Sequence, residues 1–589
     1  MRSMIFFILA LIYPVFSWQT DWQTYYEKSN YKETPGYNET ISFCKRLADA
    51  SPMVNFTTYG SSPRGRELPL LIVDKNGNSS EEQVRRTTNA VLLIQAGIHS
   101  GEIDGKDAGL MLIRDIVIYN KEPELLDHVT ILFMPIFNVD GHERSGPYNR
   151  INQNGPEEMG WRTTAQNYNL NRDYLKADAP EMQAWLKLYN KWLPEFFIDC
   201  HVTDGADYQY TVSFDMDQTG LISDNLLQWT KTEYLPVLRQ SMQELGYPII
   251  EYIAFKDWGN PLSGMTGGPS KPRFSTGYTP LQNRPGLLIE THMLKDYKTR
   301  VEGTFNMLKE TIRILNNQYL KLKDEIARAD TFTRSPDFRK QPYTLTYKEL
   351  NDSTMINFKG YKFTVEKSDL SGGDWYRFSK DTTTFKIPFY NTYGPDKQAL
   401  LPDAYIIPVE WTNIINRLSL HGIKFSRLKE ATTISVKTCR FSNPQWAPKP
   451  YENHHTLICD KKEIELKKTF PAGSAVVPMN QRTAKVIAHL LEPDGPGSLL
   501  FWGYFDPIFE VKEYAENYVM EEMARFMLSG DENLKREFKQ KMASDSLFAK
   551  NPDDILNWFY KKSPYWDNQV NLYPVGKIYD TTLVDSLLN

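Results

Sequence analysis

The sequence predicts an α/β protein: a mixed, largely parallel sheet flanked by helices, followed by a β-rich region with a helical end. Three observations predict this fold. A continuous apolar run, Val91–Ile94, breaks at Gly97 and is followed by apolar residues at helical spacing from Ile103 onwards, which indicates strand, turn and helix. Further apolar runs alternate with helical patterns as far as Ala329. After about Asp330, polar and apolar residues tend to alternate, as they do in half-buried strands.

The elements of the first half can be placed in order from these patterns. Strands are expected at 53–58, 68–74, 91–94, 128–137, 195–200 and 286–289, and helices at 39–50, 103–119, 180–193, 222–245 and 300–329. Two segments between them, 138–174 and 260–284, are polar or rich in glycine and proline. Long loops without regular structure are usually functional, so the first is expected to serve a site and the second to lie over one.

The second half has a different pattern of polar and apolar residues. Residues 344–386 alternate in polarity, residues 406–409 and 432–438 continue the strand-like character, and residues 513–545 carry a helical pattern. We therefore divide the chain into a leader of residues 1–17, a first domain of residues 18–329, and accessory domain(s) of residues 330–589. The accessory part is expected to be β-rich and then helical, and its pattern assigns it no function.

Composition and charge favour an exported globular protein. The 589 residues are 41% hydrophobic and 24% charged, which suits a large buried core. The net charge of −5 and the absence of Lys/Arg-rich runs give no indication of nucleic-acid binding. Arg2, the apolar run Met4–Phe16 and the small residue Ser17 together indicate a signal peptide over residues 1–17. We expect a secreted or periplasmic protein with no membrane span after cleavage.

Four cysteines are too few for a disulfide scaffold in an exported chain of this size. Cys439 and Cys459 lie in one strand-rich region and could pair. Cys44 and Cys200 are expected to be buried thiols. Although Cys200 stands next to a histidine, its place at the end of an apolar strand favours a small hydrophobic residue over a nucleophile.

Four side chains that can bind metal or transfer protons stand at the ends of apolar strands: His99, Glu102, His201 and Glu290. The carboxyl ends of parallel strands meet at one edge of an open α/β sheet, where ligands bind. Two histidines and a carboxylate suit a catalytic Zn²⁺, which usually takes three protein ligands and a water. We therefore expect one zinc ion per chain on His99, Glu102 and His201. Glu290 remains as the base that takes a proton from water and returns it to the leaving amine.

Together these motifs resemble the zinc carboxypeptidase family, which includes pancreatic carboxypeptidases A and B, over about residues 20–325. The family's HxxE ligand pair matches His99 and Glu102, its second zinc histidine matches His201, and its catalytic glutamate matches Glu290. The resemblance implies that the first domain is a catalytic domain that hydrolyses C-terminal amino acids from peptides. Its substrate would be a peptide or protein with a free C-terminus.

The resemblance also implies substrate contacts. Arg162 matches the arginine that polarises the scissile carbonyl, and Asn171 and Arg172 match the pair that grips the terminal carboxylate. A guanidinium suits both tasks, because it forms forked, charge-assisted hydrogen bonds and stabilises a developing oxyanion. Tyr278, the one tyrosine in the glycine-rich loop before the last strand, takes the place of the family's mobile tyrosine that caps the carboxylate.

Two positions depart from the family pattern. Pancreatic members have an arginine where this chain has Gly101, so the binding of residues further along the substrate is expected to differ. The family often has an aspartate where this chain has Asn169, and this aspartate supports the first zinc histidine. A neutral amide polarises His99 less than a carboxylate would, which is expected to weaken zinc affinity or adjust the bound water.

The leading prediction is an exported zinc metallocarboxypeptidase. A zinc-dependent deacylase of the same fold, acting on N-acyl amino acids, is a second possibility, although the chain length, the signal peptide and the Trp-Arg and Asn-Arg pairs argue against it. A non-catalytic peptide-binding relative is a third, against which Glu290 and Arg162 argue. The segment before the catalytic core is too short for the pancreatic type of pro-domain, so no zymogen is expected.

Overall fold

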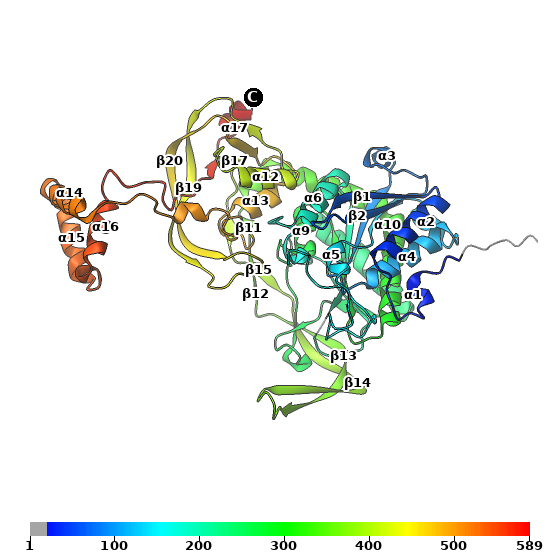
Figure 1. Cartoon of the computed structure of the whole chain (residues 1–589). Helices are drawn as coiled ribbons and strands as arrows, with labels where there is room; N and C mark the ends of the chain where they lie inside the picture. Colours follow the sequence, from blue (N-terminus) through cyan, green and yellow to red (C-terminus); the bar gives the residue numbers. More distant parts are fainter. Residues whose placement is uncertain (1–20, 204, 589) are drawn as a thin grey trace, which may run out of the picture.

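The computed structural model describes residues 21–588 apart from residue 204 (Figure 1). The predicted signal peptide lies outside the described residues. The first half is built on an eight-stranded sheet with the order β1 (Val54–Ser61), β2 (Glu67–Val73), β4 (Val129–Met134), β3 (Ala90–Ala96), β5 (Phe196–Thr203), β10 (Gly286–His292), β6 (Val212–Asp215), β7 (Ile249–Glu251). The central strands β4, β3, β5 and β10 run parallel, whereas β1, β2 and β6 make antiparallel pairings. The sheet is mixed and largely parallel, as predicted.

The parallel strands form from apolar runs that are covered on both faces. All seven residues of β3, AVLLIQA, are buried. Because successive side chains of a strand point to opposite faces, Leu92 and Ile94 enter one core and Val91 and Leu93 enter the other. The first core is covered by α2 (Tyr37–Ala50), α4 (Asp104–Val117), α7 (Asp224–Trp229), α8 (Leu235–Glu244) and α10 (Tyr297–Arg334), and the second by α6 (Pro180–Trp192) and α9 (Ser275–Leu281).

The second half is rich in strands and ends in helices, as predicted. Its larger sheet has six strands in the order β18 (Ser426–Arg427), β21 (Ala475–Pro478), β17 (Ala404–Ile407), β22 (Gly576–Ile578), β19 (Thr432–Trp446), β20 (Leu457–Phe470). Its helices are α12 (Thr412–Leu420), α13 (Ala484–Leu491), α14 (Asn517–Gly530), α15 (Glu532–Ser544), α16 (Pro552–Tyr560) and α17 (Thr581–Leu588).

The long hairpin β13 (Thr354–Lys367) and β14 (Asp374–Tyr390) projects from the body in Figure 1. The base of the hairpin is tied to the first half, because β14 pairs with β9 (Met265–Thr266), which in turn pairs with β8 (Ala254–Phe255). Small pairings and single turns complete the chain: α1 (Tyr25–Lys28), α3 (Glu81–Arg85), α5 (Val139–His142), α11 (Pro336–Lys340), β11 (Tyr343–Thr344), β12 (Tyr347–Glu349), β15 (Tyr393–Pro395) and β16 (Gln398–Ala399).

One hydrophobic core runs across the predicted domain boundary. Trp185 and Tyr278 of the first half share a buried cluster with Tyr405 and Val486 of the second. The boundary at residue 329 falls inside α10, which continues to Arg334. The division into a catalytic and an accessory domain stays a prediction, but the body of the second half packs against the sheet as a further layer. Helices α14, α15 and α16 stand apart from this body, with a small core of their own (Figure 1).

Within the described residues, no helix combines the length and the apolar character that a bilayer crossing requires.

The first turn of α6 contains a buried carboxylic acid that forms no ion pair with any of the described residues. The side chain of Glu181 has no exposed surface. Neither of its carboxylate oxygens has a hydrogen-bond partner among the described residues, and the same holds for the hydroxyl of Tyr59 nearby. Burial raises the pKa of Glu181 to about 7. The ionised form of Glu181 is therefore a source of instability in the folded protein.

We expect Glu181→Gln to stabilise the protein above neutral pH. Between pH 4.5, where the unfolded chain loses this proton, and about pH 7, the folded chain holds more protons, so the free energy of unfolding falls as the pH rises. The variant should lose this slope and gain on the order of 2 kcal/mol in free energy of unfolding at about pH 8. Urea unfolding across this range measures the slope, with the exposed Glu82→Gln as control. An unchanged slope in the Glu181 variant would contradict the expectation.

Candidate metal centre and substrate cleft

The turn between β3 and α4 places the first two predicted ligands. Gly97 ends the strand with φ of +68°, a conformation that side chains rarely adopt. The following turn is closed by a 2.8 Å hydrogen bond from the Glu102 amide to the His99 carbonyl oxygen. Both side chains are 3% exposed. The local sequence thus places an imidazole and a carboxylate side by side at the carboxyl end of the strand.

The other two predicted residues come from neighbouring parallel strands. In the pairing of β5 with β10, His201 lies directly opposite Glu290. Partners in such a pair point to the same face of the sheet. His201 and Glu290 therefore project together toward the edge where the β3–α4 turn lies, and both line the same cavity as His99 and Glu102.

Three of the four residues converge on one point. The Nδ1 atom of His99 lies 3.1 Å from Oε2 of Glu102, and Nδ1 of His201 lies 2.9 Å from the same oxygen. One ligand atom from each residue falls within 4.8 Å of the others. Nδ1 of His99 is a buried atom without a hydrogen-bond partner among the described residues. Two imidazole nitrogens and a carboxylate at this spacing fit a zinc ion.

The remaining nitrogen of each imidazole faces an oxygen. Nε2 of His99 lies 3.1 Å from Oδ1 of Asn169, and Nε2 of His201 lies 2.9 Å from Oδ2 of Asp199. Asp199 is fully buried and accepts a 2.8 Å hydrogen bond from Gln95. Such partners set the tautomer and the ring orientation of a metal-binding histidine. Asp199 was not predicted from the sequence, although its spacing of two residues from His201 on one strand was a usable signal.

The charges of these groups match the needs of a cation site. Burial lowers the pKa of His99 to about 4. Burial raises the pKa of Glu102, but His99 and Arg150 outweigh it and hold this pKa well below its usual range. For His201, burial lowers the pKa, but Asp199 and Glu102 raise it well above the usual value. At neutral pH Glu102 is thus ionised and His99 neutral, and a metal ion would displace a proton from His201.

Two arginines contact the second oxygen of Glu102. Arg150 approaches Oε1 at 2.8 Å and Arg162 at 3.2 Å. Arg162 was predicted from the sequence, whereas Arg150 was not. Arg150 crosses directly over Gly101, where an added Cβ would lie 2.5 Å from its Cδ. The missing side chain at residue 101 therefore leaves the space in which a different arginine, from the long polar loop, reaches the site.

The cluster opens into a cavity of about 640 Å³. The predicted pair Asn171 and Arg172 lies on its wall, in the 3₁₀ turn Leu170–Arg172. Asn171 is fixed by a 3.2 Å hydrogen bond from the Ser275 amide, and the guanidinium of Arg172 lies 4.4 Å from the ring centre of Phe274. Burial lowers the pKa of Arg172. The cavity is also lined by Asp215, Leu288, residues 266–271, and, from the second half, Phe389 and Asn391.

The structure contradicts the substrate-binding role predicted for Tyr278. Residues 275–281 of the expected loop form helix α9, which turns this side chain into the core with no exposed surface. Its hydroxyl bonds to Nδ1 of His421 at 2.9 Å and accepts from Gln282 at 2.8 Å. The ring lies among other aromatic rings, including that of Trp185. An aromatic residue in a glycine-rich segment was ambiguous, and packing against the second half decided its place.

One further histidine near the cluster and the cysteines have structural surroundings. His292 stacks on Tyr208 at 3.9 Å and bonds to Asp207. Cys200 is buried, and burial raises its pKa, as expected for a small packing residue. Cys439 and Cys459 are both free thiols in this structure.

Two imidazoles and a carboxylate gathered at the carboxyl edge of a parallel sheet, beside a further glutamate, suit a metal-dependent hydrolase. Residues 40–244 match the family model described as zinc carboxypeptidase. This part of the chain is similar to zinc carboxypeptidases, and the protein is a peptidase.

Curated relatives are similar over more than the catalytic region. Carboxypeptidase 2 of Trichophyton rubrum is 23% identical over 502 residues, which cover 81% of this chain and 87% of the relative. Carboxypeptidase 2 of Trichophyton equinum is 21% identical over 507 residues, with the same coverage. A match of this extent is longer than residues 18–329, so it includes part of the second half.

Solved structures give weaker likenesses. A putative carboxypeptidase A from Shewanella denitrificans OS-217 has a TM-score of 0.37 at 16% identity, covering 48% of this chain and 69% of its own. Carboxypeptidase A from Helicoverpa armigera has a TM-score of 0.36 at 15% identity, covering 51% of this chain and 75% of its own.

Proposed function

We propose that the protein is an exported, zinc-dependent carboxypeptidase that removes C-terminal amino acids from peptides. The observation that carries the proposal is the joint placement around one cavity of the His99–Glu102–His201 cluster and the pair Asn171 and Arg172. A metal cluster alone suits many hydrolases, whereas a guanidinium beside it favours a substrate with an anionic end. The name carboxypeptidase carried by the Trichophyton relatives supports the same reaction.

His99 and His201 would hold the zinc ion through Nδ1, and Glu102 would hold it through its carboxylate. When bound, zinc would supply Lewis-acid activation of the scissile carbonyl and would lower the pKa of a water molecule. The protein contributes a preformed cluster, because each histidine is oriented by an oxygen on its far side. It also keeps the three ligands nearly free of solvent.

The residues around the cluster would supply proton transfer, charge stabilisation and substrate binding. Glu290 would take a proton from the attacking water and deliver it to the leaving amine. Arg162 would stabilise the negative charge that develops on the carbonyl oxygen. Asn171 and Arg172 would hold the terminal carboxylate of the substrate, which places the last peptide bond over the cluster. The C-terminal side chain would then enter the rest of this cavity, beside residues 266–271.

The signal peptide predicted at residues 1–17 supports export into a secreted or periplasmic location. The substrate would accordingly be an extracellular peptide or protein with a free C-terminus.

We expect the mature protein to release one residue from a peptide with a free C-terminus and none from the same peptide amidated at that end. Amidation removes the negative charge that Arg172 would bind, so the last bond is no longer held over the cluster. Chromatography of the products and total zinc analysis measure both points, and a chelator should abolish release. Equal cleavage of the two peptides would instead indicate an endopeptidase cleft. Release of an acyl group from N-acyl amino acids alone would favour the deacylase, and zinc binding without any turnover would favour a binding protein.

A further inference from the structure

The second half of the chain reaches the edge of the metal cluster through one turn. Residues 447–456 join β19 to β20, and a bridge between Tyr451 and His454 narrows them into a tight turn. Glu452 and Asn453 at its tip have φ of +48° and +70°. The tip of the turn contacts the loop that carries Asn169 and Arg172.

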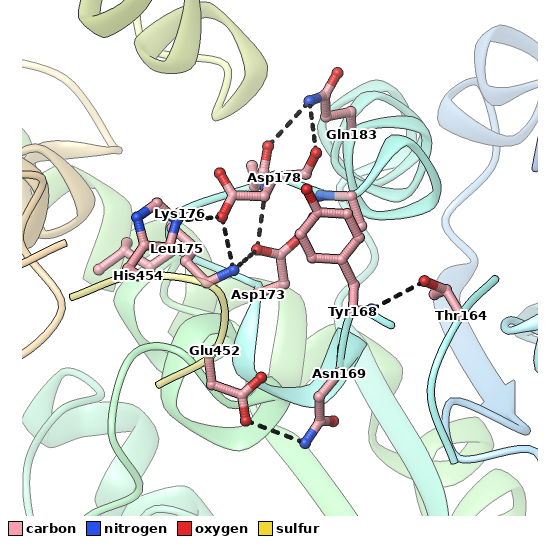
Figure 2. A network of polar contacts seen from close by, with 12 residues as sticks. Thr164, Tyr168, Asn169, Asp173, Leu175, Lys176, Asp178, Gln183, Glu452 and His454 are labelled. Atoms are coloured by element: carbon pink, nitrogen blue, oxygen red, sulfur yellow. Dashed lines mark hydrogen bonds and ion pairs between the residues drawn. The ribbon is translucent and has the colours of Figure 1, made fainter. Parts of the chain in front are cut away.

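The turn is anchored rather than loosely apposed. Nε2 of His454 lies 2.8 Å from Oδ2 of Asp178, which also accepts from Lys176 at 2.8 Å (Figure 2). The other oxygen of Asp178 accepts from Arg417 at 3.1 Å and from the hydroxyl of Tyr504. Asp178 thus gathers groups from both halves of the chain at one point. Lys176 and Arg417 offset the charge of Asp178, so this junction fixes where the turn lies.

At the tip, Glu452 meets Asn169. Oε1 of Glu452 accepts a hydrogen bond of 3.4 Å from Nδ2 of Asn169 (Figure 2). The other end of the same amide, Oδ1, faces Nε2 of His99 at 3.1 Å. A line of contacts therefore runs from the second half, through one amide, to a residue of the candidate metal cluster.

Because an amide has a donor and an acceptor, this line of contacts from Glu452 to His99 is satisfied by only one orientation of the Asn169 side chain. An asparagine presents an acceptor on one side and a donor on the other, and rotation of its side-chain amide can exchange the two. An ionised carboxylate only accepts, so Glu452 requires Nδ2 of Asn169 to point toward it. Oδ1 must then face His99 and accept its Nε2 proton. With the proton on Nε2, the lone pair of Nδ1 is directed at the cluster, which is the tautomer that a metal ion needs.

We propose that Glu452 is a positioning residue for the metal centre, acting through Asn169 to hold the metal-binding tautomer of His99. The inference rests on the proposed role of His99 as a zinc ligand. His201 needs no such device, because Asp199 offers its ring a carboxylate, which accepts on either oxygen. Asn169 offers an amide, whose reversed form would present a donor and favour the opposite tautomer of His99. An amide at residue 169 therefore requires an acceptor such as Glu452, which lies 283 residues away in the sequence, to fix its orientation.

The test is a cycle of four proteins: the parent, Glu452→Ala, Asn169→Asp and the double variant. Zinc affinity, measured by competition with a chelator of known affinity, is the main readout. We expect Glu452→Ala to bind zinc about 10-fold more weakly, the scale expected for partners beyond the ligands. In the double variant, an aspartate at residue 169 accepts from His99 whichever way it turns. Its zinc affinity should therefore return to within about 3-fold of the parent.

Three further measurements test whether the effect on zinc affinity is specific to Glu452. The exposed Glu463→Ala, on β20 of the same hairpin, should leave zinc affinity unchanged, and thermal unfolding should show that each zinc-free variant is folded. Glu452→Gln retains an acceptor and should lose less affinity than Glu452→Ala. The proposal is overturned if Glu452→Ala binds zinc as the parent does, or if Asn169→Asp fails to restore the affinity lost in that variant.

A control at the ligand separates the two proposals. If His99→Ala leaves zinc binding unchanged, the assignment of the metal centre fails, and the inference fails with it. If His99→Ala abolishes tight zinc binding while Glu452→Ala has no effect, the metal centre stands and only the positioning role of Glu452 is refuted.

Discussion

Replacing Glu290 with glutamine is expected to lower kcat by about 10³- to 10⁴-fold, at the upper end of what a single proton-transferring group contributes. Glutamine keeps the size of the side chain but can neither take a proton from water nor give one to the leaving amine. Glu290 stands opposite His201 in the sheet and is 8% exposed, so the amide fits the same place. Because Glu290 is not among the three clustered ligands, zinc content should remain at one per chain. Turnover of a free-acid peptide and metal analysis of the same sample measure the two quantities.

Glu251→Gln is the matched control for Glu290→Gln. Glu251 lines the same cavity, but on β7, where its carboxylate is held by Arg239. Its loss should change kcat by only a few-fold. Comparable loss of kcat in the two variants would show that a general property of the cavity, and not proton transfer by Glu290, is responsible. Loss of zinc from the Glu290 variant would instead place this residue among the ligands.

Replacing Arg172 with methionine is expected to lower kcat/KM for free-acid peptides by about 30- to 1000-fold. This range corresponds to the roughly 2–4 kcal/mol lost when one partner of a buried charge pair is removed. Methionine preserves much of the apolar contact with Phe274 and removes the charge. The preference for free-acid over amidated peptides should be lost together with the activity on free-acid peptides. The ratio of the two kcat/KM values is the decisive measurement, since a general folding defect would lower both together.

Arg273→Met provides the control for the carboxylate clamp. Arg273 belongs to the same cluster of cations and aromatic rings, 5.2 Å from the ring centre of Phe274, but it does not line the cavity. We expect it to keep the preference for free-acid peptides. If both arginine variants lose the preference equally, the positive field of the loop selects the substrate, and the specific contact from Arg172 does not.

Local pattern was sufficient for six of the eight strands of the main sheet and for the candidate metal cluster, whereas β6 and β7 were not predicted. Each of His99, His201 and Glu290 follows an apolar run that could be read as a buried strand, and parallel strands bring their carboxyl ends together. Asp199 could have been predicted in the same way, because a spacing of two residues on a strand places it on the same face as His201. These contacts depend on strand geometry, which the periodicity of the sequence already contains.

Contacts between distant segments were not accessible in the same way. Arg150 reaches Glu102 over the space left at Gly101, and nothing near either residue in the chain signals the approach. Tyr278 stood in a segment typical of a loop, yet a helical turn and a partner in the second half, His421, placed it in the core. In both cases the position of the side chain depends on which other segment occupies the neighbouring space.

By itself the sequence determined the class of fold, the strand ends, the three candidate ligands and the glutamate beside them, because these follow from short-range periodicity and strand order. Only the tertiary structure decided that the second half shares a core with the first, that Tyr278 lies away from the cleft, and that Glu452 meets Asn169. These are contacts across 143 to 283 residues, and they are set by the packing of complementary surfaces. The energy of such packing depends on the whole arrangement, so no local stretch of the chain encodes it.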